Sequence, residues 1–124
     1  MAESKQNIVV VDDDENMILA IQRLLSAAGF RTATFRSAEA MLQAGAARAA
    51  ACLVLDVHLP SCSGIEVYRL LADSGVRPPV VFITAHDDPE AKTQAATVGA
   101  VAYLTKPFEG RELLMAVRKA LGKA

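Results

Sequence analysis

Four short apolar segments of the sequence each end in polar or charged side chains. These side chains are, in chain order, Asp12 and Asp13, then Asp56, then Thr84, then Lys106. Continuous apolar runs of this length are typical of strands buried inside a parallel sheet, and the carboxyl ends of such strands meet at one edge, where ligands bind. Three carboxylates, a hydroxyl and an ammonium group at that edge have the chemistry to bind a metal ion and a phosphoryl group, which core packing does not explain.

The three carboxylates suit a hard divalent cation. Mg²⁺ prefers one or two carboxylates, several waters and a phosphate oxygen in an octahedral arrangement. We expect Asp12, Asp13 and Asp56 to form a Mg²⁺ site, which Mn²⁺ could also occupy. Without a cation these groups would repel one another and would be costly to bury. The metal and Lys106 are therefore expected to compensate their charge.

Asp56 is the candidate nucleophile, because its strand should be central in the sheet. A carboxylate that attacks phosphorus forms an acyl phosphate. The charge on the transferred phosphoryl oxygens would be compensated by the metal and Lys106, and a hydrogen bond would come from Thr84. Each residue alone has an ordinary structural explanation, since an Asp after a strand is usually a turn residue. Because complementary polar groups occur at the ends of four separate strands, a binding or catalytic site is a better explanation than four unrelated turns.

Extended and helical patterns alternate along the whole chain. Strands are predicted at residues 8–11, 31–35, 52–55, 80–83 and 102–105. Helix starts are expected at Asp14 or Glu15, Ser37, Ser63 and Asp88, and helix ends near Gly29, Gly45, Gly99 and Gly122. Ser63 to Glu66 also fits a capping box, after a loop at residues 60–64.

Because crossovers between parallel strands are right-handed, these helices should cover both faces of one sheet. The expected fold is α/β, a flavodoxin-like doubly wound (βα)5 sheet of five parallel strands, forming a single domain over residues 1–124. Strand order 2-1-3-4-5 is the usual solution for a chain of this size.

Composition excludes several classes of protein. The net charge of −1 provides no basic field for direct binding of nucleic acid or of an anionic membrane surface. Cys52 and Cys62 have no zinc-site spacing and are expected to be reduced, non-ligand thiols. The polar N-terminus lacks a signal sequence, and no apolar run approaches the roughly 18 residues of a membrane span. We expect a cytoplasmic protein.

The motifs resemble those of the receiver domain of two-component response regulators, the CheY-like family, over essentially the whole chain. The matching segments are Val11-Asp12-Asp13, the D-x-x-x-P-x-x-x-G pattern of Asp56, Pro60 and Gly64, then Thr84-Ala85 and Lys106-Pro107-Phe108. The resemblance implies a signalling switch rather than an enzyme. It also implies that Asp56 accepts a phosphoryl group from the phosphohistidine of a sensor histidine kinase, or from a small acyl phosphate.

The resemblance assigns further roles within the site. It implies that Asp13 and Asp56 bind Mg²⁺ directly, that Asp12 acts largely through water, and that the backbone carbonyl of His58 completes the metal ligands. Lys106 would pair with the phosphoryl oxygens, and its bond to Pro107 is expected to be cis.

The resemblance also implies a conformational switch. Thr84 would move toward the phosphoryl group and Tyr103 would turn inward, although a half-buried strand aromatic is the ordinary explanation for Tyr103. The output face would be the fourth helix, fifth strand and fifth helix, used for homodimerisation or for an effector. His58 and His86 are expected to tune the lifetime of the acyl phosphate; the alternative is that both are exposed and idle.

Other classes of protein fit less well. A phosphatase of the haloacid dehalogenase type needs a second Asp two residues after the first, but His58 follows Asp56 at that spacing. Asp14 does follow Asp12 at the required spacing, but the residues at the ends of the later strands do not match the pattern of this type of phosphatase. A nucleotide-binding domain needs a glycine-rich phosphate loop, and neither common form is present. The remaining alternative is a phosphorylation-independent receiver that acts only as an interaction module, although every residue whose loss would favour it is present.

Two segments resemble receivers attached to helix-turn-helix DNA-binding domains, namely residues 37–40 and 106–109. By that analogy an output domain, absent from this chain, would make the DNA contacts.

Overall fold

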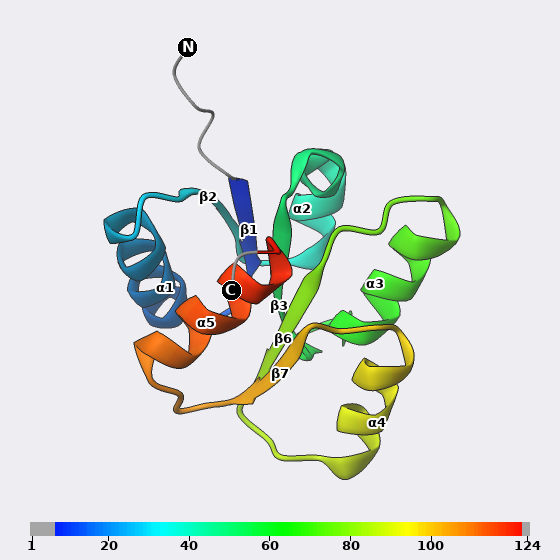
Figure 1. Ribbon diagram of the computed structural model, residues 1–124. Coiled ribbons are helices and arrows are strands. Elements are labelled where there is room, and N and C mark those ends of the chain that lie inside the picture. Colours follow the sequence, from blue (N-terminus) through cyan, green and yellow to red (C-terminus); the bar gives the residue numbers. More distant parts are fainter. Residues whose placement is uncertain (1–6, 123–124) are drawn as a thin grey trace.

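A five-stranded parallel sheet lies at the centre of the computed structural model, which describes residues 7–122 (Figure 1). Its strands are β1 (Asn7–Val11), β2 (Arg31–Phe35), β3 (Cys52–Asp56), β6 (Val80–Thr84) and β7 (Ala102–Thr105). The spatial order is β2-β1-β3-β6-β7, and all neighbouring strands run parallel. This is the predicted order 2-1-3-4-5, so the doubly wound α/β fold is confirmed.

Helices cover both faces of the sheet (Figure 1). They are α1 (Glu15–Ala27), α2 (Ala38–Gln43), α3 (Gly64–Asp73), α4 (Pro89–Thr97) and α5 (Gly110–Ala120), with a short 3-10 helix at Ala46–Ala49. Alternate strand residues face opposite sides, which divides the core in two. Ile8 and Val10 pack with residues of α1 and α5, whereas Val9 and Val11 pack with residues of α2, α3 and α4.

The predicted helix boundaries follow from local capping. Asp14 accepts hydrogen bonds from the N–H groups of Asn16 and Met17, Ser37 caps α2, and Asp88 caps α4 with Pro89 in the first turn. Glycines with positive φ follow α1, α2, α4 and α5 at the predicted positions, which are Gly29, Gly45, Gly99 and Gly122.

Two local predictions at the start of α3 were wrong. The expected loop contains a two-residue antiparallel pairing of β4 (His58–Leu59) with β5 (Cys62–Ser63). The expected capping box is not formed, because Ser63 Oγ accepts from the N–H of Ile65 and the Glu66 carboxylate pairs with Arg69 instead. Two-residue strands are too short to show a periodicity in the sequence. The capping motif matched in sequence, but the Glu66 side chain bonds to Arg69 and not to the Ser63 backbone.

Both cysteines are free thiols, Cys52 buried and Cys62 partly buried. None of the helices in residues 7–122 is long and apolar enough to cross a membrane.

Candidate functional site

The polar residues at the strand ends gather at the carboxyl edge of the sheet. Asp12 follows β1, Asp56 ends β3, Thr84 ends β6 and Lys106 follows β7. Asp12, Asp56 and Thr84 are the buried polar or charged residues within the part of the chain that the structure describes. Burial of such groups is costly unless they have partners, so their neighbours determine what the site can do.

Lys106 is the cationic partner of the two buried carboxylates. Its Nζ atom donates to Asp12 Oδ2 at 2.8 Å and to Asp56 Oδ2 at 3.2 Å. The Lys106 backbone N–H donates to the carbonyl oxygen of Thr84 at 2.7 Å, which holds the segment after β7 against the end of β6. The Lys106–Pro107 peptide bond is cis, as expected. One ammonium therefore joins the ends of β1, β3 and β7.

The other oxygen of each buried carboxylate accepts a backbone hydrogen bond. Asp56 Oδ1 accepts from the His58 N–H at 2.9 Å. Asp12 Oδ1 accepts from the Asp14 N–H, also at 2.9 Å. These contacts orient both carboxylates before any ligand binds.

The electrostatics favour an additional cation. Burial raises the pKa of Asp56 and the nearby Asp12 carboxylate raises it further, while the His58 N–H and Lys106 act in the opposite direction. Burial alone would lower the pKa of Lys106, but its hydrogen bond to Asp12 and the charges of Asp56 and Asp12 outweigh burial and raise it. Lys106 is therefore charged at neutral pH, and a second cation would stabilise the ionised form of Asp56.

Three carboxylates are close enough to share one ion. Ligand atoms of Asp12, Asp13 and Asp56 all lie within 4.8 Å of one another. Asp13 is exposed, which leaves room for the water molecules that Mg²⁺ retains. This all-oxygen, partly solvated set fits a hard divalent cation. The backbone carbonyl of Asp13 also accepts from Arg36 at 3.3 Å, which ties the turn after β1 to the segment after β2.

Gly64 brings the start of α3 against the backbone of Asp56. A Cβ atom at this glycine would overlap the Asp56 carbonyl oxygen, and the Gly64 N–H donates to the Val57 carbonyl oxygen at 2.8 Å. The sequence motif includes Gly64, but its spacing alone does not reveal this contact.

The hydroxyl of Thr84 is engaged within its own loop. Its Oγ1 atom accepts from the His86 N–H and donates to the His86 carbonyl oxygen, both at 3.1 Å. Tyr103 is half-buried, and its hydroxyl donates to the Asp88 carbonyl oxygen at 3.5 Å.

The rings of His58 and His86 lie edge to face, with centroids 5.3 Å apart. This contact was not foreseen.

A family model described as the response regulator receiver domain matches residues 8–118. The chain belongs to this family. It is therefore a receiver domain of the kind found in response regulators of two-component systems.

Curated relatives of this receiver are longer proteins. The response regulator protein TmoT of Ectopseudomonas mendocina is 39% identical over 121 residues, which cover 98% of this chain and 55% of TmoT. The transcriptional regulatory protein FixJ of Azorhizobium caulinodans is 34% identical over 115 residues, covering 93% of this chain and 54% of FixJ. The receiver thus spans about half the length of these relatives.

Solved structures of receivers superpose closely on this one. The response regulator StyR has a TM-score of 0.88 and 39% identity, covering 96% of this chain and 60% of StyR. The structure titled FixJ-N has a TM-score of 0.86 and 32% identity, covering 98% of each chain.

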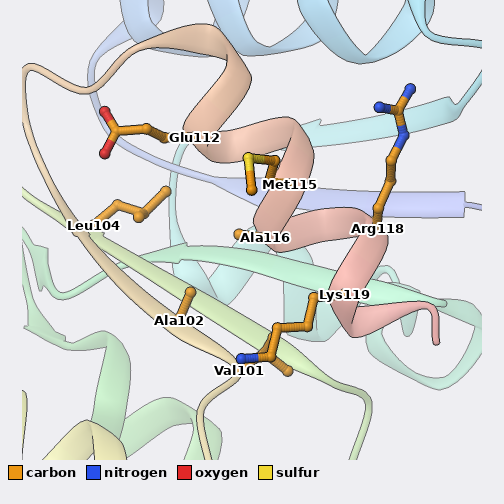
Figure 2. A pocket seen from close by; sticks show the side chains of 8 residues that line it. All are labelled: Val101, Ala102, Leu104, Glu112, Met115, Ala116, Arg118 and Lys119. Atoms are coloured by element: carbon orange, nitrogen blue, oxygen red, sulfur yellow. The ribbon is translucent and has the colours of Figure 1, made fainter. Parts of the chain in front are cut away.

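The receiver also has a mainly apolar pocket of about 590 Å³ between β7 and α5, and Asp12, Asp13 and Asp56 are not among its lining residues. Figure 2 shows Ala102 and Leu104 of β7 and Met115 and Ala116 of α5 lining it. Met115, which lines this pocket, is 68% exposed.

Proposed function

We propose that this receiver accepts a phosphoryl group on Asp56 from the phosphohistidine of a sensor histidine kinase in the cytoplasm. A carboxylate oxygen of Asp56 attacks phosphorus, the bond from phosphorus to the histidine nitrogen breaks, and that nitrogen keeps the electron pair. The observation that carries the proposal is the preorganised Asp56 carboxylate, with one oxygen on Lys106 and the other on the His58 N–H. The product is a switch state rather than a released product, so the domain is not a turnover enzyme.

The proposed metal ligands are Asp13 and Asp56, with Asp12 acting through water and the His58 carbonyl completing the set. Bound Mg²⁺, or Mn²⁺ in its place, would neutralise charge on the phosphoryl oxygens. The clustering of the three carboxylates within 4.8 Å supports this assignment. Lys106 already contacts both Asp12 and Asp56, so its ammonium could bind a phosphoryl oxygen once Asp56 has become an acyl phosphate.

Acetyl phosphate provides the test. Intact-mass spectrometry should show the gain of one phosphoryl group with Mg²⁺, none with EDTA, and none in Asp56→Asn, because that amide is not a nucleophile. Asp73→Asn, an exposed substitution on α3, should still gain the phosphoryl group.

The phosphoacceptor proposal is wrong if the wild type gains no phosphoryl group from acetyl phosphate or from a kinase phosphodonor and also does not bind beryllofluoride. The phosphorylation-independent interaction module would then be the better interpretation. A gain that persists in Asp56→Asn would instead assign the acceptor to another residue.

We further propose that Thr84 and Tyr103 are the switch residues. Thr84 would have to exchange its bonds to the His86 backbone for one to the phosphoryl group, which frees the loop leading to Asp88. Tyr103 contacts the Asp88 carbonyl through its hydroxyl, so movement of that loop would release the ring.

Tyrosine fluorescence should report this movement, since the sequence has two tyrosines and no tryptophan. In a Tyr68→Phe background, Mg²⁺ with beryllofluoride should change the emission of Tyr103. An unchanged spectrum under conditions where ¹⁹F NMR shows bound beryllofluoride would exclude Tyr103 from the switch.

His58 and His86 are proposed to set the lifetime of the acyl phosphate. Both side chains are exposed, their rings meet edge to face, and the His58 N–H donates to Asp56 Oδ1. We infer that the pair orders or blocks the attacking water. His58→Ala and His86→Ala should each change the rate of phosphoryl loss by about tenfold or less, because only water access is altered. Loss of ³²P at fixed Mg²⁺ measures this, and unchanged rates in both variants would leave the pair without this role.

The pocket between β7 and α5 supports an output role for the face formed by α4, β7 and α5. We propose that this face forms a homodimer or holds an effector. The chain covers 54% of FixJ, whose name describes it as a transcriptional regulatory protein. On this basis we propose a DNA-binding output domain beyond the receiver.

A further inference from the structure

The two histidines of the chain lie against each other although they come from different segments. His58 is the first residue of the short strand β4, and His86 lies in the loop after β6. Both side chains are exposed, so apolar burial does not account for their contact. Their ring centroids are 5.3 Å apart with an interplanar angle of 80°.

We propose that His58 and His86 together bind one borderline divalent transition-metal ion, of the Zn²⁺, Ni²⁺ or Cu²⁺ class. Imidazole nitrogen suits these ions, whereas the oxygen ligands of the acidic cluster suit Mg²⁺. With a metal–nitrogen distance of about 2.0–2.1 Å, two imidazoles on one tetrahedral ion have centroids about 5 Å apart. The observed centroid separation of 5.3 Å is close to this value, so the two side chains are near enough to share an ion once their rings turn from the edge-to-face orientation.

The backbone on both sides of the site is held in place. β3 and β6 are neighbouring strands with Asp56 opposite Ile83, and the Val57 N–H donates to the Ile83 carbonyl oxygen at 2.9 Å. Beyond these strands, the His58 N–H is bound by Asp56 and the His86 N–H by Thr84. Only rotation of two exposed side chains is needed to turn one nitrogen of each ring toward a common point.

The site is an open one. In residues 7–122, no third histidine, cysteine or carboxylate groups with the pair at ligand spacing. Cys62 is near in sequence, but it pairs with Leu59 across the β4–β5 ladder while His58 pairs with Ser63. Adjacent strand residues point to opposite sides, so the Cys62 thiol faces away from His58. Water or an external ligand would fill the remaining positions on the ion.

Zn²⁺ titration by calorimetry tests the pair, using untagged protein with excess Mg²⁺ to occupy the carboxylates. Because no other histidine is present, His58→Ala and His86→Ala should each weaken Zn²⁺ binding by about tenfold or more. Cys62→Ser, the matched control for a nearby soft ligand, should bind Zn²⁺ like the wild type. Asp73→Asn, which removes an exposed carboxylate on α3 outside the phosphoacceptor site, should also bind Zn²⁺ like the wild type.

Equal Zn²⁺ affinity in wild type and both histidine variants, or no binding by the wild type, would overturn the proposal. Loss of binding in Cys62→Ser would overturn the two-imidazole assignment in favour of a thiol site. The Cu²⁺ electron paramagnetic resonance spectrum of the wild type gives a measurement that does not depend on variants. Coupling to two nitrogens is expected, and an all-oxygen spectrum contradicts the assignment.

Discussion

Replacing Lys106 with methionine should lower the free energy of unfolding by about 3 kcal/mol in EDTA, since removal of one partner leaves a buried charge uncompensated. Lys106 contacts Asp12 at 2.8 Å and Asp56 at 3.2 Å, and the exposed fractions of these two carboxylate side chains are 0% and 6%. Methionine is also unbranched and ends one heavy atom before the position of the ammonium, so it replaces the stem of the lysine without its charge. Urea denaturation of both proteins measures the difference.

Mg²⁺ should restore part of that loss, because it supplies positive charge to the same carboxylates. Lys119→Met is the matched control: Lys119 is exposed on α5, so this variant should stay within about 0.5 kcal/mol of the wild type. A Lys106→Met variant as stable as the wild type in EDTA would show that the two carboxylates do not depend on the ammonium.

Alkaline pH should reduce the difference between the wild type and Lys106→Met. The pKa of Lys106 is raised above its ordinary value of 10.5 in the folded state. Its contribution to stability is therefore complete below the unfolded pKa and is lost as the pH rises through the higher folded pKa. The unfolding curves should converge above about pH 10.5.

Much of the fold was predictable because its signals are local. Asp14, Ser37 and Asp88 accept the capping hydrogen bonds that their positions suggested. The strand order is not a local signal, since no residue dictates which strands are neighbours. It was predicted correctly because one order is common in this class of fold. The β4–β5 pairing and the 3-10 helix at Ala46–Ala49 were missed because two to four residues carry no measurable periodicity.

The sequence was enough to predict which residues come together in the site, but not how each of them is hydrogen-bonded there. Parallel strands deliver their carboxyl ends to one edge, so the convergence of Asp12, Asp56 and Lys106 follows from the topology. The hydrogen bonds of Thr84 to His86 and the contact between the two histidine rings depend on how two loops lie over the sheet. No spacing in the sequence encodes those loop positions.

Gly64→Ala should destabilise the protein by about 2–3 kcal/mol, at the upper end of what an added methyl group costs in a packed site. The new Cβ would overlap the carbonyl oxygen of Asp56. That oxygen belongs to the backbone at the end of β3 and cannot rotate away, so α3 or the Asp56 segment must shift. We therefore also expect slower phosphorylation by acetyl phosphate, because the shift misplaces the Asp56 carboxylate.

Gly110→Ala is the matched control for this substitution. Gly64 and Gly110 are each the first residue of a helix, and neither has positive φ, so an alanine there meets only a packing constraint. At Gly110 the Cβ would lie 3.1 Å from Leu24 Cδ1, the end of a side chain that can move. Gly110→Ala should stay within about 1 kcal/mol of the wild type. Equal stability and phosphorylation rates in the two variants would mean that α3 can move off the Asp56 backbone without cost, and that Gly64 does not position the acceptor.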